Sequence, residues 1–313
     1  MLFAFFLASL ALAVDAGDRP IIGVFAHPAT SNGDYLAASY VKWVESAGGR
    51  VVPIPYNAPI EYLSSIVPQF NGILFPGGAA ELNDQATFIV RLAIALNDKG
   101  THFPIWGTCL GLEWLLQITA DDKEILDQGF DASNISLPLN FTDEARSSRL
   151  FGSMNADVYN WLATKPLTMN SHVNGITTKH FEQSREVSSF YNALATNVDR
   201  NGVEFISAFE AYNYPIYGVQ FHPEKSMFEF GEKDSGTPHE VINHSFEAIS
   251  ASQYFANFFV NEARMNDQKF HDPHEEQAAL IYNYRTYTVK SPKFVETYLF
   301  KHDYPTSFWK VFV

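Results

Sequence analysis

The only cysteine of the chain lies in a motif suited to nucleophilic chemistry. Cys109 is the centre of Gly-Thr-Cys-Leu-Gly, which begins at Gly107 and lies between a predicted strand and a predicted helix. A tight strand-to-helix turn exposes its central side chain, and flanking glycines relieve crowding there. The helix N-terminus favours thiolate over thiol, and the N–H of Leu110 points toward the reaction space. We predict that Cys109 is a nucleophile; the alternative is an inert, buried thiol.

A cysteine nucleophile needs a base, and His222 is the strongest candidate among ten histidines. The apolar stretch 216–221 delivers it from a strand end, and Pro223 and Glu224 follow. The proline biases His222 to an extended conformation, so that side chains two residues apart can project to the same side. Glu224 can then accept from one imidazole nitrogen while the other faces the thiol. The alternative is a His-Pro-Glu turn with no catalytic role.

The elements around these residues alternate between strand and helix. Strands are predicted at 20–25, 51–54, 72–75 and 103–106, and helices at 34–47, 60–70, 84–98 and 112–118. The first of these helices has Tyr40 among its apolar positions. The pattern predicts an α/β protein with a doubly wound, mostly parallel sheet and helices on both faces.

After residue 120 the pattern loosens. Segments 204–209 and 216–221 flank a turn and resemble a hairpin, and 250–263 predicts a closing helix. We expect one main domain over residues 17–285 and a C-terminal extension over 286–313. That extension is expected to pack on the domain or on a partner subunit.

Composition limits the partners. The 313 residues carry a formal net charge of −14, without a basic run. Nucleic acid and anionic membranes are therefore excluded as expected partners. The length fits one large domain or two small ones.

The N-terminus predicts the secretory route. An uncharged, mostly apolar run from Leu2 to Val14 is too short to span a bilayer and ends at a small-residue cleavage site after Ala16. The alternative is a buried strand or helix. Sequons at Asn134, Asn140 and Asn243 agree with secretion. We expect a signal peptide over 1–16 and a destination outside the cell or in a lysosome or vacuole, where a lone cysteine has no disulfide partner in its own chain.

Three motifs in chain order carry a family resemblance. Phe-Pro-Gly-Gly at 75–78, Gly-Thr-Cys-Leu-Gly at 107–111 and His-Pro-Glu-Lys at 222–225 resemble the class I glutamine amidotransferase superfamily and, within it, the gamma-glutamyl hydrolase family. The similarity covers roughly residues 19–285. The chain departs from animal members in lacking further cysteines and in the end of its C-terminal segment.

The resemblance implies a catalytic triad of Cys109, His222 and Glu224. It implies an oxyanion hole formed by the backbone N–H groups of Gly78 and Leu110. It also implies an amide hydrolysis through a thioester, with folylpoly-γ-glutamates and antifolate polyglutamates as substrates, no metal or other cofactor, and a homodimer.

Three further residues match substrate-binding positions of the family. Glu113 follows the nucleophile by four residues, and its alternative role is that of an ordinary acid in the first turn of a helix. His172 matches a family histidine near the active site; without the resemblance it is a loop residue. Tyr35 matches a position that lines the pocket, although an aromatic residue there also suits the core.

Two other functions share these features. A glutaminase subunit would use the same triad, but it requires an acceptor domain or partner, and the predicted leader argues against it. A secreted binding protein that has lost activity would be expected to have a broken triad, whereas all three positions are filled here.

Overall fold

The structure, a computed structural model, describes residues 16–29, 33–288 and 293–301. Its centre is an eight-stranded sheet with the order β4-β1-β5-β6-β12-β11-β10-β8. The five strands from β4 to β12 are parallel, and β11, β10 and β8 are antiparallel. The strands are β1 (Ile21–Phe25), β4 (Arg50–Ile54), β5 (Gly72–Phe75), β6 (Ile105–Thr108), β8 (Asn140–Phe141), β10 (Tyr191–Val198), β11 (Glu204–Ala211) and β12 (Ile216–Val219).

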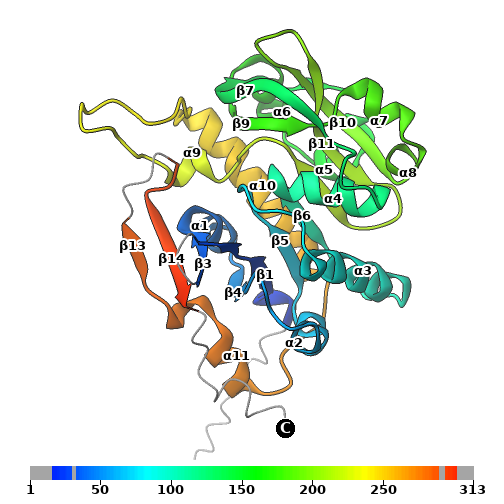
Figure 1. Ribbon diagram of the computed structural model, residues 1–313, viewed down its shortest axis with the longest axis vertical. Helices are drawn as coiled ribbons and strands as arrows, with labels where there is room; N and C mark the ends of the chain where they lie inside the picture. The colour runs from blue at the N-terminus through cyan, green and yellow to red at the C-terminus, as the bar shows by residue number, and fades with distance from the viewer. Residues whose placement is uncertain (1–15, 30–32, 289–292, 302–313) are drawn as a thin grey trace, which may run out of the picture.

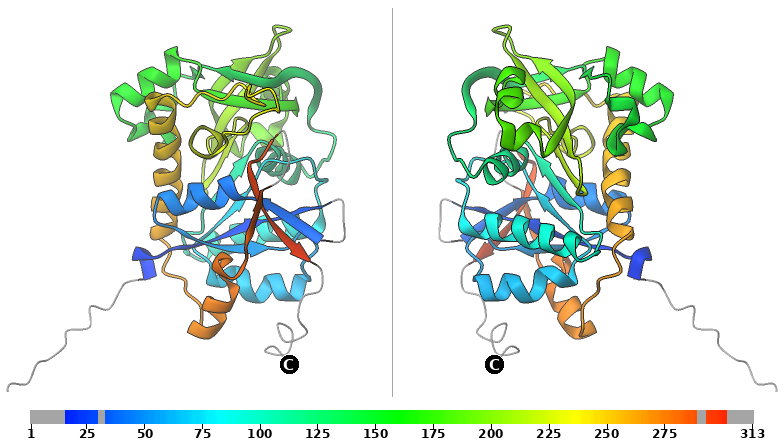
Figure 2. Two further views of the ribbon diagram at one scale, coloured as in Figure 1. Left: turned by 90° about the vertical axis from the view of Figure 1, so that its left-hand side faces the viewer. Right: turned by 90° about the vertical axis from the view of Figure 1, so that its right-hand side faces the viewer.

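Helices cover both faces of this sheet (Figure 2). One face packs against α2 (Ile60–Ile66), α3 (Asp84–Asp98) and α4 (Leu110–Ala120), and the other against α1 (Ala38–Ser46) and α10 (Phe246–Arg264). Side chains of β1 alternate between the two faces. Ile21 and Phe25 belong to the hydrophobic core on the side of α2, α3 and α4, and Ile22 and Val24 belong to the core on the side of α1 and α10. The doubly wound α/β class is therefore confirmed.

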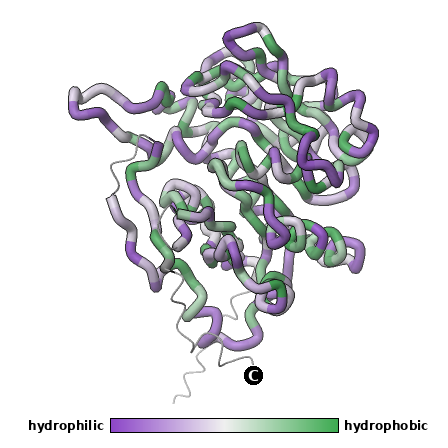
Figure 3. The backbone as a smooth tube through the Cα atoms, viewed as in Figure 1, coloured by the Kyte–Doolittle hydropathy of each residue, from purple (hydrophilic) through white to green (hydrophobic). Residues whose placement is uncertain are grey.

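Shorter elements surround this core. The hydrophobic segments are concentrated in the central strands and the hydrophilic ones in the outer loops (Figure 3). The remaining helices are α5 (Arg149–Gly152), α6 (Ala156–Thr164), α7 (Thr178–Gln183), α8 (Arg185–Ser188), α9 (Lys225–Phe228) and α11 (Pro273–Ala279), with 3-10 turns at Ala16–Asp18, Val67–Gln69, Ala145–Ser147 and Ile281–Asn283.

Two small sheets complete the fold. One pairs β7 (Asp127–Leu137) with β9 (Thr168–Gly175). The other has the order β13-β14-β3-β2 and joins the two ends of the chain (Figure 1). Its strands are β2 (His27–Pro28), β3 (Gly33–Ala37), β13 (Thr286–Thr288) and β14 (Glu296–Lys301). The C-terminal extension thus packs on its own domain over residues 296–301.

The elements agree with most of the sequence-based expectations. Helix α3 has the predicted bounds, and β11 and β12 form the expected antiparallel pair. The helix predicted from Asp34 was wrong over its first turn, because 33–37 is strand β3, paired with β2 and β14. The closing helix α10 begins earlier than predicted, where the Ser245 side chain accepts a hydrogen bond from the N–H of Ala248.

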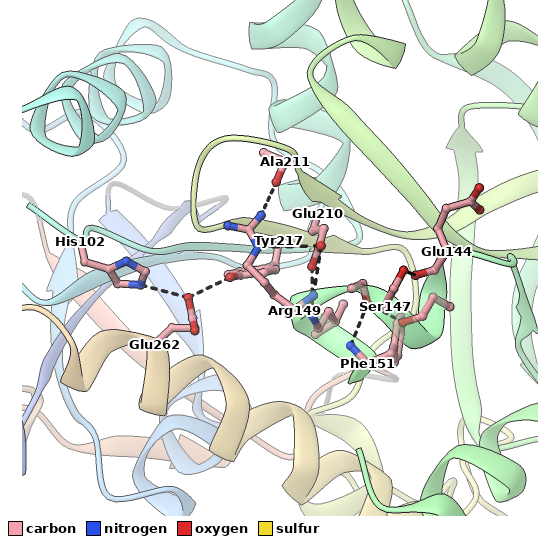
Figure 4. Close-up of polar contacts among 12 residues, drawn as sticks. His102, Glu144, Ser147, Arg149, Phe151, Glu210, Ala211, Tyr217 and Glu262 are labelled. Atoms are coloured by element: carbon pink, nitrogen blue, oxygen red, sulfur yellow. Dashed lines mark hydrogen bonds and ion pairs between the residues drawn. The ribbon is translucent and has the colours of Figure 1, made fainter. Parts of the chain in front are cut away.

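A polar network ties α10 to the sheet (Figure 4). Oε2 of Glu262 contacts Nε2 of His102 at 3.0 Å and accepts from the hydroxyl of Tyr217 at 2.8 Å. Nearby, the Glu210 carboxylate accepts from the backbone N–H of Arg149 at 3.1 Å. Helix α10 is therefore fixed to β12 by polar contacts as well as by apolar packing.

Some expectations fall elsewhere. The predicted signal peptide, apart from Ala16, and residues 302–313 of the extension lie outside the described residues. No helix in the described ranges is long and apolar enough to cross a membrane.

Candidate active site

Cys109 lies at the turn between β6 and α4. Its backbone is in a strained, positive-φ conformation, with φ 51° and ψ −107°. The flanking glycines are required by close packing, since a methyl on Gly111 would lie 2.1 Å from the carbonyl oxygen of Phe75 and one on Gly107 would lie 2.7 Å from Gly111. The Cys109 N–H donates to the carbonyl of Val219 at 2.8 Å, which fixes the turn to β12.

The turn borders a pocket of about 490 Å³. The wall is built from the β5 end, the Cys109 turn, the β12 end and the small sheet that contains β14. It is lined by His27, Pro28, Ala29, Tyr35, Gly77, Gly78, Ala79, Ala80, Cys109, Ser171, His222, Lys225, Lys293, Phe294, Thr297 and Leu299.

His222 and Glu224 form a buried pair beside the thiol. Nδ1 of His222 lies 2.8 Å from Oε1 of Glu224, and the backbone N–H of His222 donates to the carbonyl of Met169 at 2.8 Å. A methyl on Gly77 would lie 2.5 Å from Cε1 of His222 and 3.2 Å from Cβ of Cys109, so the two side chains meet across this glycine. Nε2 of His222 forms no hydrogen bond within the described part of the chain.

Tyr40 links this pair to the β5 loop. Its hydroxyl accepts from the N–H of Gly77 at 2.8 Å and lies 3.2 Å from Nδ1 of His222. The ring is buried, in helix α1. Tyr40 therefore holds the imidazole and the glycine loop at a fixed separation.

The environment of the thiol keeps it protonated at rest. Burial raises the pKa of Cys109, and the carboxylates of Glu113 and Glu224 raise it further. The N–H of Leu110 acts in the opposite direction. The net direction is opposite to that expected from the helix N-terminus, because desolvation outweighs the dipole.

Glu113 lies behind the thiol and outside the pocket lining. It is buried, and Oε1 accepts from Nε2 of Gln220 at 3.0 Å. The same Nε2 lies 3.7 Å from Sγ of Cys109. Burial raises the pKa of Glu113 to about 7. In the structure Glu113 contacts the thiol environment through Gln220, and it is not placed against the pocket.

His172 is also buried outside the pocket lining. Its Nδ1 lies 2.7 Å from the carbonyl of Asn174, and its ring packs on Phe130 and Phe205. Burial lowers its pKa to about 4. The neighbouring Ser171, rather than His172, lines the cavity.

The other predicted positions lie at the cavity or next to the thiol. Tyr35 and Gly78 line it, and the N–H of Leu110 acts on the thiol. Lys225, for which a solvated surface position was an open alternative, is instead only 1% exposed and pairs with Glu240. Within the described ranges, no cluster of three or more His, Cys, Asp or Glu side chains could hold a metal ion.

The site residues that were missed from the sequence include His27, Tyr40 and Gln220. Gln220 precedes His222 by two positions, so strand periodicity could have identified it. Tyr40 matched an apolar helix position, and nothing local signals its hydroxyl contacts. His27 belongs to a two-residue strand whose pairing depends on distant segments.

The fold and site define an α/β enzyme with a cysteine at a strand-to-helix turn. Residues 20–224 match the family model of peptidase C26. The chain is 41% identical to gamma-glutamyl hydrolase B of Dictyostelium discoideum, covering 96% of this chain and 88% of that protein. It is 38% identical to gamma-glutamyl hydrolase of Homo sapiens, covering 94% of each. Gamma-glutamyl hydrolase 1 of Arabidopsis thaliana is 36% identical, covering 85% of this chain and 78% of that protein. The chain belongs to the peptidase C26 family and is a hydrolase.

Proposed function

We propose that the chain hydrolyses the γ-glutamyl amide bonds of folylpoly-γ-glutamates and antifolate polyglutamates, with Cys109 as nucleophile. The observation that carries this proposal is the meeting of Cys109 and the His222–Glu224 pair at one pocket. Relatives that match this chain over most of their length are named gamma-glutamyl hydrolase, which supports cleavage of a γ-glutamyl bond. The lone cysteine leaves one thiol to act.

In the first step, Nε2 of His222 takes the thiol proton as Sγ of Cys109 attacks the γ-carbonyl carbon. A neutral thiol at rest makes this proton transfer part of the attack. Glu224 accepts from the Nδ1 side and stabilises the imidazolium that forms. His222 then gives the proton to the departing amine as the C–N bond breaks, which leaves a thioester on Cys109.

In the second step, His222 removes a proton from water, which attacks the thioester carbon and releases the carboxylic acid. The sulfur leaves and regains its proton from the imidazolium. The enzyme returns to its starting state without a net change in oxidation.

The developing oxyanion is assigned to the N–H groups of Gly78 and Leu110. The N–H of Gly78 has no acceptor among the described residues, and the N–H of Leu110 already faces Sγ. Each such donor contributes roughly 3 kcal/mol to lowering the barrier. Because Gly78 has no side chain, its loop can lie close to the bound substrate.

The cavity suits an anionic substrate although the chain is acidic. Lys225 and Lys293 line it, and no Asp or Glu of the described ranges does so. A poly-γ-glutamyl chain carries one free α-carboxylate per residue, and a wall without acidic side chains does not repel it, although the Lys225 ammonium is itself paired with Glu240.

The test incubates the chain with a folyl-γ-glutamate ladder and, separately, with glutamine. We expect shorter folyl products and free glutamate from the ladder, little ammonia from glutamine, and no products with Cys109→Ala. Ammonia release from glutamine that exceeds peptide cleavage would favour a glutaminase, and unchanged cleavage by Cys109→Ala would refute the mechanism.

We further propose that the protein enters the secretory route, carries N-glycans and forms a homodimer. Asn134 and Asn140 are exposed, whereas Asn243 is half-buried. In an acidic compartment Glu113, whose pKa is about 7, becomes protonated and no longer opposes thiol ionisation. A mass shift of the mature protein after glycosidase treatment tests for N-glycans, and light scattering tests for the homodimer.

A further inference from the structure

The small sheet presents one face to the catalytic pocket. Tyr35 on β3 lies opposite His27 on β2 and opposite Leu299 on β14, and Thr297 lies opposite Ala37. Directly paired residues, and those two apart on a strand, point to the same side of a sheet. His27, Tyr35, Thr297 and Leu299 accordingly line the same pocket as Cys109. The C-terminal strand is therefore part of the wall of the active site.

Two polar side chains on this face are buried without a hydrogen bond of full geometry to the described residues. His27 is 2% exposed, and neither ring nitrogen forms a hydrogen bond of full geometry with a described residue, although the backbone carbonyls of Pro76 and Gly77 lie beside the ring and act on it. Thr297 is 4% exposed, and its hydroxyl forms none either. Leaving a buried polar group unsatisfied costs about 1–3 kcal/mol. Because both groups border a cavity, a bound molecule can satisfy them.

His27 stands directly beside the proposed oxyanion loop. A methyl on Gly78 would lie 2.8 Å from Nε2 of His27, which places the ring edge at that glycine. Trp114 and Tyr35 hold the ring, with centroid distances of 5.5 Å and 6.0 Å. Burial lowers the pKa of His27 to about 4, so the ring is neutral near neutrality and offers one N–H donor.

The charge of the wall selects the ligand group. The imidazole N–H and the threonine O–H are donors, and no Asp or Glu of the described residues lines the cavity, while the Lys225 ammonium is already paired with Glu240. Two hydrogen-bond donors at a wall without an acidic side chain match a carboxylate of the ligand. On a γ-linked glutamyl residue the α-carboxylate is the anionic group that lies closest to the scissile γ-carbonyl.

We propose that His27 and Thr297 bind the α-carboxylate of the γ-glutamyl residue whose γ-carbonyl Cys109 attacks. This inference rests on the proposed function and assigns the recognition of the acyl side of the bond. The two donors hold the residue so that its carbonyl reaches the thiol. A γ-glutamyl group is then distinguished from one whose α-carboxylate is masked.

The test compares two γ-glutamyl anilides that differ only in a free α-carboxylate or an α-carboxamide. We expect wild type to favour the carboxylate substrate in kcat/KM by about tenfold or more. Thr297→Val and His27→Leu should each raise KM for that substrate by about tenfold, the equivalent of one hydrogen bond to a charged group, and reduce the preference. Thr297→Ser and His27→Gln retain a hydrogen-bond donor and should keep the wild-type KM and the preference for the carboxylate substrate.

Thr286→Val, at an exposed position of β13, is the matched control and should behave as wild type. If Thr297→Val and His27→Leu both keep the wild-type KM and the wild-type preference for the carboxylate substrate, they do not differ from Thr297→Ser and His27→Gln. The proposal is then wrong, while the proposed function stands. If wild type cleaves neither anilide nor the folyl ladder, the proposed function fails and the inference falls with it.

Discussion

Two clusters of polar groups, a half-buried one at α10 and a buried one at the active site, differ in how completely their hydrogen bonds are satisfied. In the α10 network, Glu262 is contacted by both His102 and Tyr217 (Figure 4). At the active site, Oε2 of Glu224, the ring nitrogens of His27 and the hydroxyl of Thr297 form no hydrogen bond of full geometry with a described residue, although two backbone carbonyls lie beside the His27 ring.

The difference separates stability from function. A satisfied network repays the cost of burying its groups, whereas unsatisfied groups lower stability and persist where a ligand uses them. We therefore expect changes at the α10 network to affect unfolding and changes at the pocket to affect turnover.

The largest expected effect is on catalysis at His222. His222→Asn removes the proposed base and should lower kcat by roughly 10³-fold, since general acid–base catalysis contributes about 10²–10⁴. Glu262→Gln should instead cost about 1–3 kcal/mol of unfolding free energy with little change in kcat. Steady-state glutamate release and urea unfolding measure the two. An equal loss of kcat in both variants would contradict the assignment of the α10 network to stability and of the pocket to turnover.

The next effect is the pH dependence of stability due to Glu113. The pKa of Glu113 in the folded protein, about 7, lies above the usual 4.5. Its contribution to the free energy of unfolding is therefore complete below pH 4.5 and is lost as the pH rises through 7. Relative to Glu113→Gln, wild type should lose on the order of 3 kcal/mol between about pH 4 and about pH 8.

Urea unfolding of both proteins across this range measures that difference. The comparison with a variant is needed because His27 and His172, with pKa values lowered to about 4, contribute stability that is lost as the pH falls below 6.5. Glu182→Gln, exposed on α7, should follow wild type. Parallel curves for Glu113→Gln and wild type would show that Glu113 is not held in a low-polarity site.

A third expectation concerns the contact between the catalytic side chains. Gly77→Ala places a methyl 2.5 Å from the His222 ring, which must then move, and kcat/KM should fall about 100-fold, since misplacing a catalytic group by about 1 Å costs that much. Gly231→Ala meets His239 at an ordinary 3.5 Å and serves as control. Wild-type kinetics in Gly77→Ala would mean that this glycine does not separate the two groups.

The smallest expected effect is that of Tyr40→Phe. Loss of the hydroxyl frees the Gly77 N–H and the Nδ1 side of His222, so kcat should fall about tenfold, equivalent to about 1.4 kcal/mol, with KM nearly unchanged. Tyr254→Phe removes a hydroxyl that donates to Leu150 and should leave kcat as it is. A rise in KM without a change in kcat would assign Tyr40 to substrate binding.

Local patterns in the sequence were sufficient to predict six of the eight strands of the central sheet and the cysteine turn, whereas β8 and β10 were not predicted. Apolar runs alternate with amphipathic stretches, and glycines flank Cys109 where the packing leaves no room for a Cβ. The antiparallel pair of β11 and β12 followed from its turn residues.

The pocket wall could not be predicted in this way. Strand β3 pairs with β14, which lies near the other end of the chain, and no local signal reports such a pairing. The direction of the Cys109 pKa was also missed, because burial depends on tertiary packing while the helix dipole can be inferred from sequence. His27 and Thr297 become a pair only through this sheet.

The central claim is that one thiol performs the chemistry, and alkylation of Cys109 tests it most directly. With a single cysteine in the chain, each iodoacetamide addition to sulfur marks one site, which intact mass spectrometry counts. We predict that γ-glutamyl hydrolysis falls in proportion to the modified fraction and reaches zero at full modification. Fully alkylated, folded protein that retains wild-type turnover would contradict the account.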